Sequence, residues 1–262
     1  MQQPALPLAP GYIGLGAYSK SHVDAFSFLS NNAALAQLPH TSAGITGERR
    51  FLMKELGAYT AALGIILPSG RFGFNFLYAG FAAFGQMQTG LAYARSLGTR
   101  MDLGLRINYH RFRIAGYGAS SALSVESGII LHLPGSLHVG IATCTPAIGK
   151  FGAGRTESLP SVFKWGLGYE ASPVAYISTE IIKETNEPVN VRAGLQYLVL
   201  SKLILHAGVS TASSSIWTGI GFSNELLRID VAATFHPDLG ISPGLLVLFH
   251  AKKRQPKLVE AE

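Results

Sequence analysis

Apolar side chains recur at every second position over most of this chain. Within residues 100–110, one set of alternate positions is occupied only by Met101, Leu103, Leu105, Ile107 and Tyr109. The positions between them are charged, polar or glycine, and residues 189–199 and 227–236 repeat the pattern. A period of two places alternate side chains on opposite faces of a β-strand. The chain is therefore predicted to consist mainly of strands with one apolar and one polar face.

Segments of this kind follow one another from about residue 42. Their predicted ranges are 42–50, 56–67, 71–81, 86–96, 100–111, 121–133, 136–145, 161–171, 173–183, 188–199, 202–211, 214–223, 226–236 and 241–251. The connections alternate between tight turns, such as residues 134–135, and longer links, such as residues 146–160. Bacterial outer-membrane barrels combine an even number of strands with short turns at one end and longer loops at the other. The pattern predicts an all-β, antiparallel transmembrane barrel of about fourteen strands.

Alternation alone does not say which face meets water, because soluble and membrane barrels share it. A membrane barrel has an apolar outer band and a polar interior. Low charge, glycines on the polar face and the positions of aromatic residues favour the membrane barrel over a soluble apolar core. Aromatic residues of the apolar face lie near both strand ends, at Tyr59, Tyr78, Tyr109 and Phe235 toward the loops and at Tyr169 and Tyr197 toward the turns. Such girdles mark membrane interfaces, so we expect contact with lipid in the bacterial outer membrane.

Composition narrows the function classes. The 262 residues are 48% hydrophobic and 14% charged, which suits a chain with a large buried or lipid-facing area and not a disordered one. The 21 basic and 15 acidic residues give a net charge of +6, but the basic residues are scattered, so no nucleic-acid partner is expected. No stretch approaches the roughly 20 consecutive apolar residues that a spanning helix needs.

No motif of enzymatic or metal chemistry stands out. Cys144 is the only cysteine, and no two histidines have the spacing of metal ligands on one strand, so neither a disulfide nor a metal site is expected. Residues 149–155 are rich in glycine but lack the spacing and the Lys-Ser or Lys-Thr ending of a phosphate-binding loop. We predict a protein that is not an enzyme and that uses no cofactor.

Residues 1–40 do not follow the alternating pattern. They comprise a proline-rich beginning, a glycine-rich stretch at 11–18 and a predicted short helix near 23–36. The interior of a barrel has to be filled by side chains, a plug or water. We therefore predict three parts, which are a plug segment at 1–40, the barrel at 41–251 and a periplasmic tail at 252–262.

Short motifs in this first part resemble the beginning of the PorV and PorQ barrels, a branch of the FadL-like outer-membrane proteins. The residues that carry the resemblance are Gly14, Gly16, Ala17, Tyr18, Asp24, Asn31, Asn32 and Leu35. Asn32 stands where that family has proline, and Ala34 stands where it has glycine. The resemblance implies fourteen strands, a plug in the lumen and residence in the outer membrane of Bacteroidetes-type bacteria. It also implies association with the type IX secretion system.

Charged residues of both signs fall on the predicted lumen face. The set proposed as a polar lumen network is Arg100, Asp102, Arg106, Glu126, Arg192, Arg228 and Asp230. Unpaired charges in a narrow interior are costly, so we expect these side chains to bond with one another, with the plug or with water. The alternative interpretation of the same charges is a selective pore.

Several functions fit this picture. The first is a subunit or scaffold of a secretion or cell-surface assembly, with other outer-membrane or secretion-system proteins as partners. The alternative is a FadL-like transporter that passes small hydrophobic substrates through the lumen and out by a lateral gap. A kinked strand and an apolar lumen pocket would favour transport, whereas a polar lumen filled by residues 1–40 would favour the scaffold. A soluble lipid-binding barrel is a third hypothesis.

Overall fold

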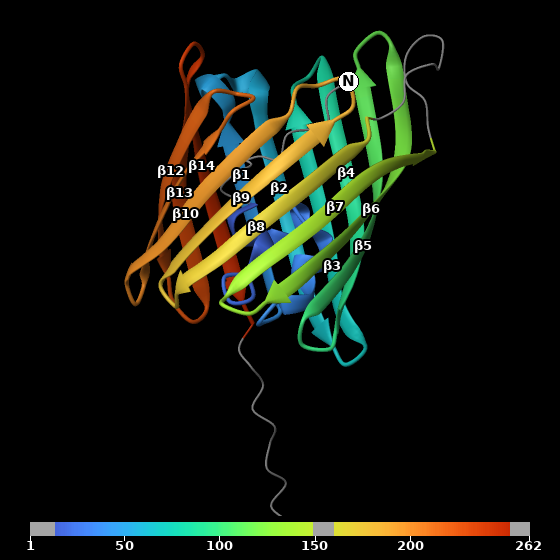
Figure 1. Ribbon diagram of the computed structural model, residues 1–262. Coiled ribbons are helices and arrows are strands. Elements are labelled where there is room, and N and C mark those ends of the chain that lie inside the picture. The colour runs from blue at the N-terminus through green and yellow to red at the C-terminus, as the bar shows by residue number, and fades with distance from the viewer. Residues whose placement is uncertain (1–13, 149–159, 252–262) are drawn as a thin grey trace, which may run out of the picture.

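The computed structural model, which describes residues 14–148 and 160–251, folds those residues into fourteen β-strands. The strands are β1 (Ser42–Arg49), β2 (Gly57–Leu67), β3 (Gly70–Gly80), β4 (Phe84–Leu97), β5 (Met101–Ile114), β6 (Gly118–Leu133), β7 (Leu137–Ile148), β8 (Val162–Ser172), β9 (Ala175–Glu184), β10 (Asn190–Leu200), β11 (Leu203–Ser210), β12 (Ser215–Ser223), β13 (Leu227–His236) and β14 (Gly240–His250). Each strand pairs antiparallel with its neighbours in sequence, and β1 pairs with β14 (Figure 1). The sheet is closed, which confirms the predicted fold.

The two rims of the barrel differ in their connections. Ser42 at the start of β1 pairs with His250 at the end of β14, so the barrel begins and ends at one rim. This rim, here called the turn end, also carries the tight turns, and the opposite rim, the loop end, carries η4 (Arg50–Leu52) and η5 (Lys54–Leu56). The link predicted at 112–120 is shorter than expected, because β5 and β6 extend the hairpin and leave only residues 115–117 between them.

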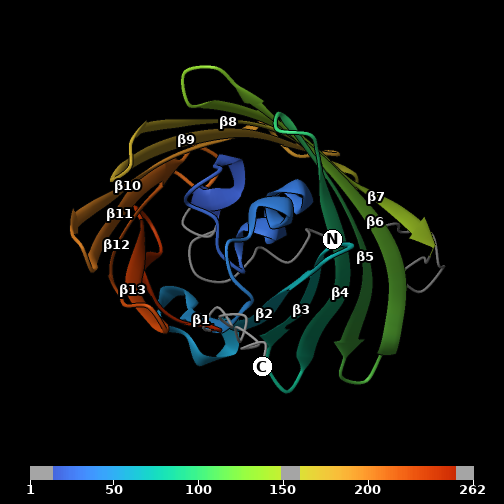
Figure 2. The ribbon, with the colours of Figure 1, turned by 90° about the horizontal axis from the view of Figure 1, so that it is seen from below.

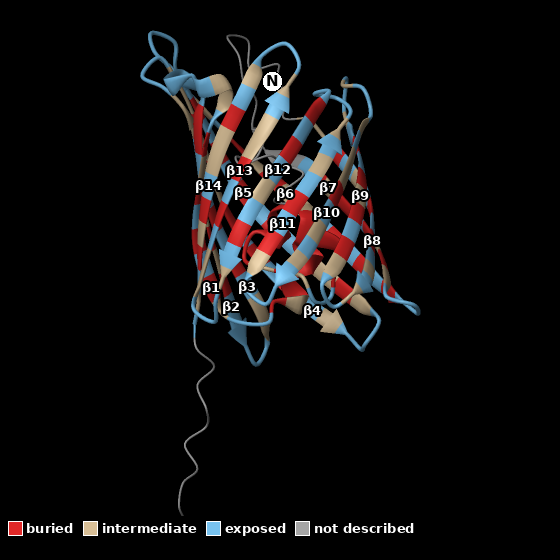
Figure 3. Cartoon of the chain, turned by 90° about the vertical axis from the view of Figure 1, so that its left-hand side faces the viewer, coloured by how far each residue is buried: buried red, intermediate tan, exposed pale blue. Residues whose placement is uncertain are grey.

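The alternation in sequence becomes an apolar exterior and a polar interior. On β5, Leu105 and Ile107 are 47% and 52% exposed, whereas Asp102 and Asn108 are both 0% exposed. Figure 3 shows the same alternation of exposed and buried residues along strands on the side facing the viewer, such as β11 and β12. No helix in the described ranges is long and apolar enough to cross a membrane. Lipid therefore meets the apolar set of side chains, and the lumen meets the polar set.

An arginine in place of Leu105 is expected to destabilise the inserted barrel by about 2–4 kcal/mol, because this side chain faces lipid near the middle of β5. The measurement is the free energy of unfolding in urea with the barrel in lipid vesicles. Leu105→Phe is the matched control, because it keeps an apolar side chain at the same depth. Equal losses for the two variants would contradict the assignment of inside and outside.

Residues 14–40, here called the lumen segment, lie inside the barrel in its turn-end half (Figures 1 and 2). The segment forms three short 3-10 turns, η1 (Leu15–Tyr18), η2 (Ser27–Leu29) and η3 (Asn32–Gln37). The predicted helix over 23–36 is therefore wrong. Asn31 has an extended backbone, with φ −137°, and its side chain accepts a hydrogen bond from Ala33 N, which starts η3 as a separate turn. Residues 1–13 of the predicted plug and the predicted tail at 252–262 lie outside the described residues.

Candidate functional site in the lumen and its apolar wall

Glycines on the lumen face make room for the lumen segment. A Cβ atom at Gly104 would overlap the peptide that joins Asn32 to Ala33. A Cβ atom at Gly168 would overlap the carbonyl oxygen of Tyr18. The backbone of the segment therefore approaches the wall more closely than any other residue type would allow. This contact explains part of the glycine content of the polar face, since Gly90, Gly208 and Gly221 lie against side chains of the wall instead.

Tyr18 ties the resemblance motif to the wall. Its Oη donates to Glu180 Oε1 over 2.7 Å, and the residue is 1% exposed. Arg192 Nη1 lies 3.7 Å from the other oxygen of Glu180, so this carboxylate links β9, β10 and the lumen segment. Burial, followed by the charge of Glu180, raises the pKa of Tyr18 well above its ordinary value. The phenol stays protonated and remains a donor.

The residues that follow Tyr18 surround one carboxylate. Glu170 Oε1 accepts from Ser19 Oγ over 2.6 Å, from Lys20 N over 2.7 Å and from Ser21 N over 2.9 Å. Hydrogen bonds from backbone N–H groups and hydroxyls stabilise an ionised carboxylate. This contact has no signal in the sequence, because Ser19, Lys20 and Ser21 form no motif and Glu170 lies about 150 positions away in the chain.

Asp24 has a local role and a long-range role. Its Oδ1 accepts from Phe26 N over 2.8 Å and from Ser27 N over 3.1 Å, which starts η2. Its Oδ2 lies 3.3 Å from Arg228 Nη1. The same guanidinium donates from Nε to Asp230 Oδ2 over 2.8 Å. Arg228 is thus held between an acid of the lumen segment and an acid of β13.

The remaining motif residues shape the backbone of the lumen segment. Asn31 Oδ1 accepts from Ala33 N over 3.0 Å, and its Nδ2 donates to Ile141 O over 3.4 Å. Asn32 is 1% exposed, and neither side-chain amide atom has a hydrogen-bond partner among residues 14–148 and 160–251. The contact between Asn32 and the wall is made by its backbone, which lies against Gly104. The other motif positions are buried or half-buried within the segment, at Gly14, Gly16, Ala17 and Leu35.

A line of hydrogen-bonding side chains crosses β5, β6, β7 and β8 near the turn end. Asp102 Oδ2 lies 2.7 Å from His132 Nε2, and His132 Nδ1 lies 2.8 Å from His138 Nδ1. His138 Nε2 lies 3.4 Å from Glu170 Oε1. Gln37 Nε2 donates to Asp102 Oδ2 over 2.7 Å. Both ends of this line therefore hold the lumen segment, at Gln37 and at the residues around Glu170.

The Arg106–Glu126 ion pair lies in the middle of the lumen. Arg106 Nη2 lies 2.6 Å from Glu126 Oε2, and the two side chains are 3% and 13% exposed. The same Nη2 lies 3.4 Å from Leu29 O of the lumen segment. Lys164 Nζ donates to the next carbonyl, Ser30 O, over 3.1 Å. Two cations of the wall therefore bind backbone carbonyls between η2 and η3.

The predicted lumen charges form separate clusters, each against the lumen segment or a neighbouring strand. Arg100 is the exception, because it is exposed at the turn end beside a cavity of about 480 Å³. Of the other six, Arg106, Glu126, Arg192, Arg228 and Asp230 have ion-pair partners, and Asp102 lies 2.7 Å from His132 Nε2. Within the described part of the chain, no group of three His, Cys, Asp or Glu residues is arranged to hold a metal ion.

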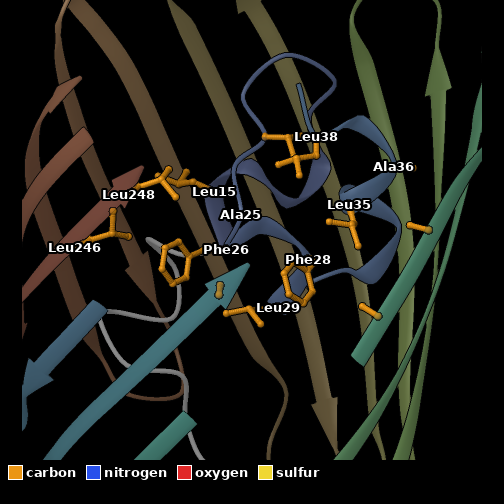
Figure 4. Packing of buried hydrophobic residues seen from close by; sticks show 14 of the residues in the cluster. Leu15, Ala25, Phe26, Phe28, Leu29, Leu35, Ala36, Leu38, Leu246 and Leu248 are labelled. Atoms are coloured by element: carbon orange, nitrogen blue, oxygen red, sulfur yellow. The ribbon is translucent and has the colours of Figure 1, made fainter. Parts of the chain in front are cut away.

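An apolar cluster lies in the lumen against β14 and β1. Phe26 and Leu29 of the lumen segment cluster with Leu246 and Leu248 of β14 (Figure 4). Gly44 of β1 lies against this cluster, and a Cβ atom at Gly44 would overlap the Phe26 ring and Leu248. At this point the wall has no side chain on its inner face, so its thickness is little more than that of the backbone.

An apolar groove of about 630 Å³ lies in the wall formed by β14, β1 and β2. Its lining consists of Ile45, Thr46, Gly47, Glu48, Arg49, Tyr59, Thr60, Ala61, Phe76, Pro243, Gly244, Leu245 and Val247. Small outward residues at Gly47 and Ala61 leave the space, and larger apolar side chains surround it. The kinked strand that would favour transport is not found in this wall, because β1 pairs with β2 and β14 in unbroken register.

Comparison with known proteins identifies the fold but no sequence family. No family model and no curated protein matches the chain. The CymD monoaromatic hydrocarbon channel superposes with a TM-score of 0.68 at 10% identity, over 96% of this chain and 98% of that one. The Pseudomonas putida toluene transporter TodX gives 0.65 at 11% identity, over 95% and 98%. A Pseudomonas aeruginosa FadL homologue gives 0.62 at 11% identity, over 95% and 97%. This chain has the FadL-like barrel fold.

These comparisons correct the first functional interpretation. The similar structures are hydrocarbon channels and transporters, so the interpretation as a secretion scaffold is wrong, and the transporter alternative agrees better with them. The comparisons agree with the fold that the FadL-like resemblance implies, and they do not test its PorV and PorQ branch. Together with the apolar exterior, the fold confirms residence in the bacterial outer membrane and contact with its lipid.

Proposed function

We propose that this protein is a channel that passes small hydrophobic molecules across the outer membrane. The observation that carries the proposal is the apolar lumen side at Phe26, Leu246 and Leu248, which is separated from the external groove only by β1. The fold, shared with channels for monoaromatic hydrocarbons, supports it. An apolar solute gains free energy from apolar contacts on both sides of this wall, whereas a hydrophilic solute does not.

The loop-end part of β1 is the place where the wall is best suited to open. The ladder between β1 and β14 stops at the pair Glu48 and Gly244. The next residue of β14 is Pro243, which has no N–H group to donate to a neighbouring strand. Separating β1 from β14 there breaks few hydrogen bonds. We infer that the substrate moves from the lumen to the groove, and then into lipid, past this end of β1.

The proposal is tested by uptake into intact cells. Cells of a bacterial strain without hydrocarbon channels of its own are compared with and without this protein. The solutes are a radiolabelled monoaromatic hydrocarbon and a hydrophilic solute of similar size. We expect the protein to increase uptake of the hydrocarbon several-fold and to leave uptake of the hydrophilic solute unchanged. Equal hydrocarbon uptake by both cell types would overturn the proposal.

Ala61→Phe is expected to reduce hydrocarbon uptake to near the background level, because a phenyl ring at this position fills the groove. The matched control is Ala207→Phe, which also adds a ring to an exposed position on the outer face, but on β11 and away from the groove. Uptake by the control should equal that of the unchanged protein. Similar losses in both variants would show that the groove has no part in transport.

A further inference from the structure

The charges on the strands are sorted by sign between the two faces of the barrel. Within the described strands, every acidic residue points into the lumen or its rim, at Glu48, Asp102, Glu126, Glu170, Glu180, Glu184 and Asp230. Every outward-facing charged residue in the same strands is basic, at Arg49, Arg95, Arg111, Arg113 and Lys183. A surface of this kind attracts anionic groups at the membrane interface.

Two of these cations lie together on β5. Arg111 and Arg113 face outward, next to Tyr109 of the loop-end girdle, and are both exposed. Positions two apart on one face of a strand are about 7 Å apart, which lets two guanidinium groups approach one phosphate or two neighbouring ones. Within the described part of the chain, neither side chain has a hydrogen bond or an ion pair.

The neighbouring strands leave space around this pair. Arg113 lies opposite Gly85 of β4 and Ala119 of β6, and Arg111 lies opposite Met87 of β4 and Ser121 of β6. None of these four neighbours is acidic, and only Met87 has a long side chain. The guanidinium groups are therefore open to a ligand that approaches from the membrane side at the loop end.

The same face carries an apolar groove closer to the middle of the membrane. A hollow of about 370 Å³ over β2, β3, β4 and β5 is lined by Leu63, Ile65, Phe72, Gly73, Phe74, Leu91, Ala92, Tyr93, Leu105 and Ile107. Along β5, Ile107 is four residues from Arg111, a separation of about 13 Å. This distance is short enough for the acyl chains of a lipid to reach the groove when its phosphate is at the arginine pair.

From this arrangement we propose that β4 and β5 bind a phosphate-bearing lipid of the outer leaflet. Arg111 and Arg113 hold the phosphate, and the groove beside Leu105 and Ile107 holds the acyl chains. The loop end faces the outside in barrels of this type, which places the arginines in the outer leaflet. Arginine suits this role because its planar donors match phosphate oxygens in pairs. The proposal does not depend on transport through the lumen.

The test measures lipid binding by the purified full-length barrel in neutral detergent, with native mass spectrometry as the readout. The probes are lipid A with two phosphates and fully dephosphorylated lipid A. We expect the phosphorylated form to bind about tenfold more tightly or better, and Arg111→Gln with Arg113→Gln to abolish that preference. Arg95→Gln, at an outward arginine near the turn end, is the matched control and should keep the preference.

Three results would overturn the proposal. The first is an unchanged preference in the double variant, and the second is an equal loss of preference in Arg95→Gln. The third is complete displacement of the lipid by millimolar inorganic phosphate, which would show a site for free phosphate. Folding of each variant is checked by the change in gel mobility on heating. If the double variant does not fold, Arg113→Gln alone tests the same point, because it lies farther from the apolar band.

Discussion

Replacing Gly104 with leucine is expected to displace the lumen segment from its position against β5 and to make the barrel permeable to ions and small hydrophilic solutes. The new side chain would occupy the volume of the peptide between Asn32 and Ala33. A small shift cannot relieve this overlap, because the sheet holds the strand in place. The segment therefore has to leave this position and break its bonds at Glu170, Asp102 and Glu180. The measurement is single-channel conductance in planar bilayers.

The matched control for this prediction is Gly85→Leu. Gly85 faces outward on β4, and a Cβ atom there makes only ordinary contacts, 3.7 Å from Tyr78 Oη. This variant should insert and conduct like the unchanged protein. A closed barrel in both variants would mean that the lumen segment does not determine permeability. Failure of Gly104→Leu to insert would mean that the segment is needed to form the barrel.

Replacing Arg106 with methionine is expected to lower the free energy of unfolding by about 3–5 kcal/mol, because it leaves the Glu126 carboxylate in the lumen without its ion-pair partner. It also removes the contact from Nη2 to Leu29 O. The measurement is urea unfolding of the barrel in lipid vesicles. The pair lies inside the barrel, so the loss does not come from altered lipid contact.

The double variant with Glu126→Gln provides the internal control. Removing the negative charge should restore a substantial part of the lost stability, because the desolvated carboxylate is the costly group. Additive losses in the double variant would show that the two residues act independently. A loss below about 1 kcal/mol for Arg106→Met alone would show that the pair is effectively in water.

Most of the fold could be predicted because the alternation of apolar and polar residues can be recognised in each strand of a barrel separately. The alternation in residues 100–110 needs no distant partner to be recognised, and the strand found there, Met101–Ile114, has its apolar residues on the outside. Strand ends were harder to predict. From Arg111 to Ile114 the alternation changes face, because the outward positions become arginine, and pairing with β4 and β6 is what continues the strand.

The candidate site could be predicted less well. Tyr18 and Asp24 were identified through their motif, but their partners Glu180 and Arg228 lie more than 150 positions away. The contact between Gly104 and the peptide that joins Asn32 to Ala33 could not be predicted, because Gly104 is one of many glycines in the sequence. The external groove has no local signal either, because Gly47 and Ala61 become its floor only when β1 and β2 pair with larger neighbours on both sides.

The membrane barrel could be recognised from the sequence, because the period of two, the low charge and the positions of aromatic residues can be read strand by strand. The pairing of the charges, the position of the lumen segment and the apolar groove on the outside of the wall became clear only from the folded barrel. Closing the sheet sets the register between strands, and the register places residues far apart in sequence within hydrogen-bonding distance. Function in this barrel depends on those contacts between strands, which no single strand encodes.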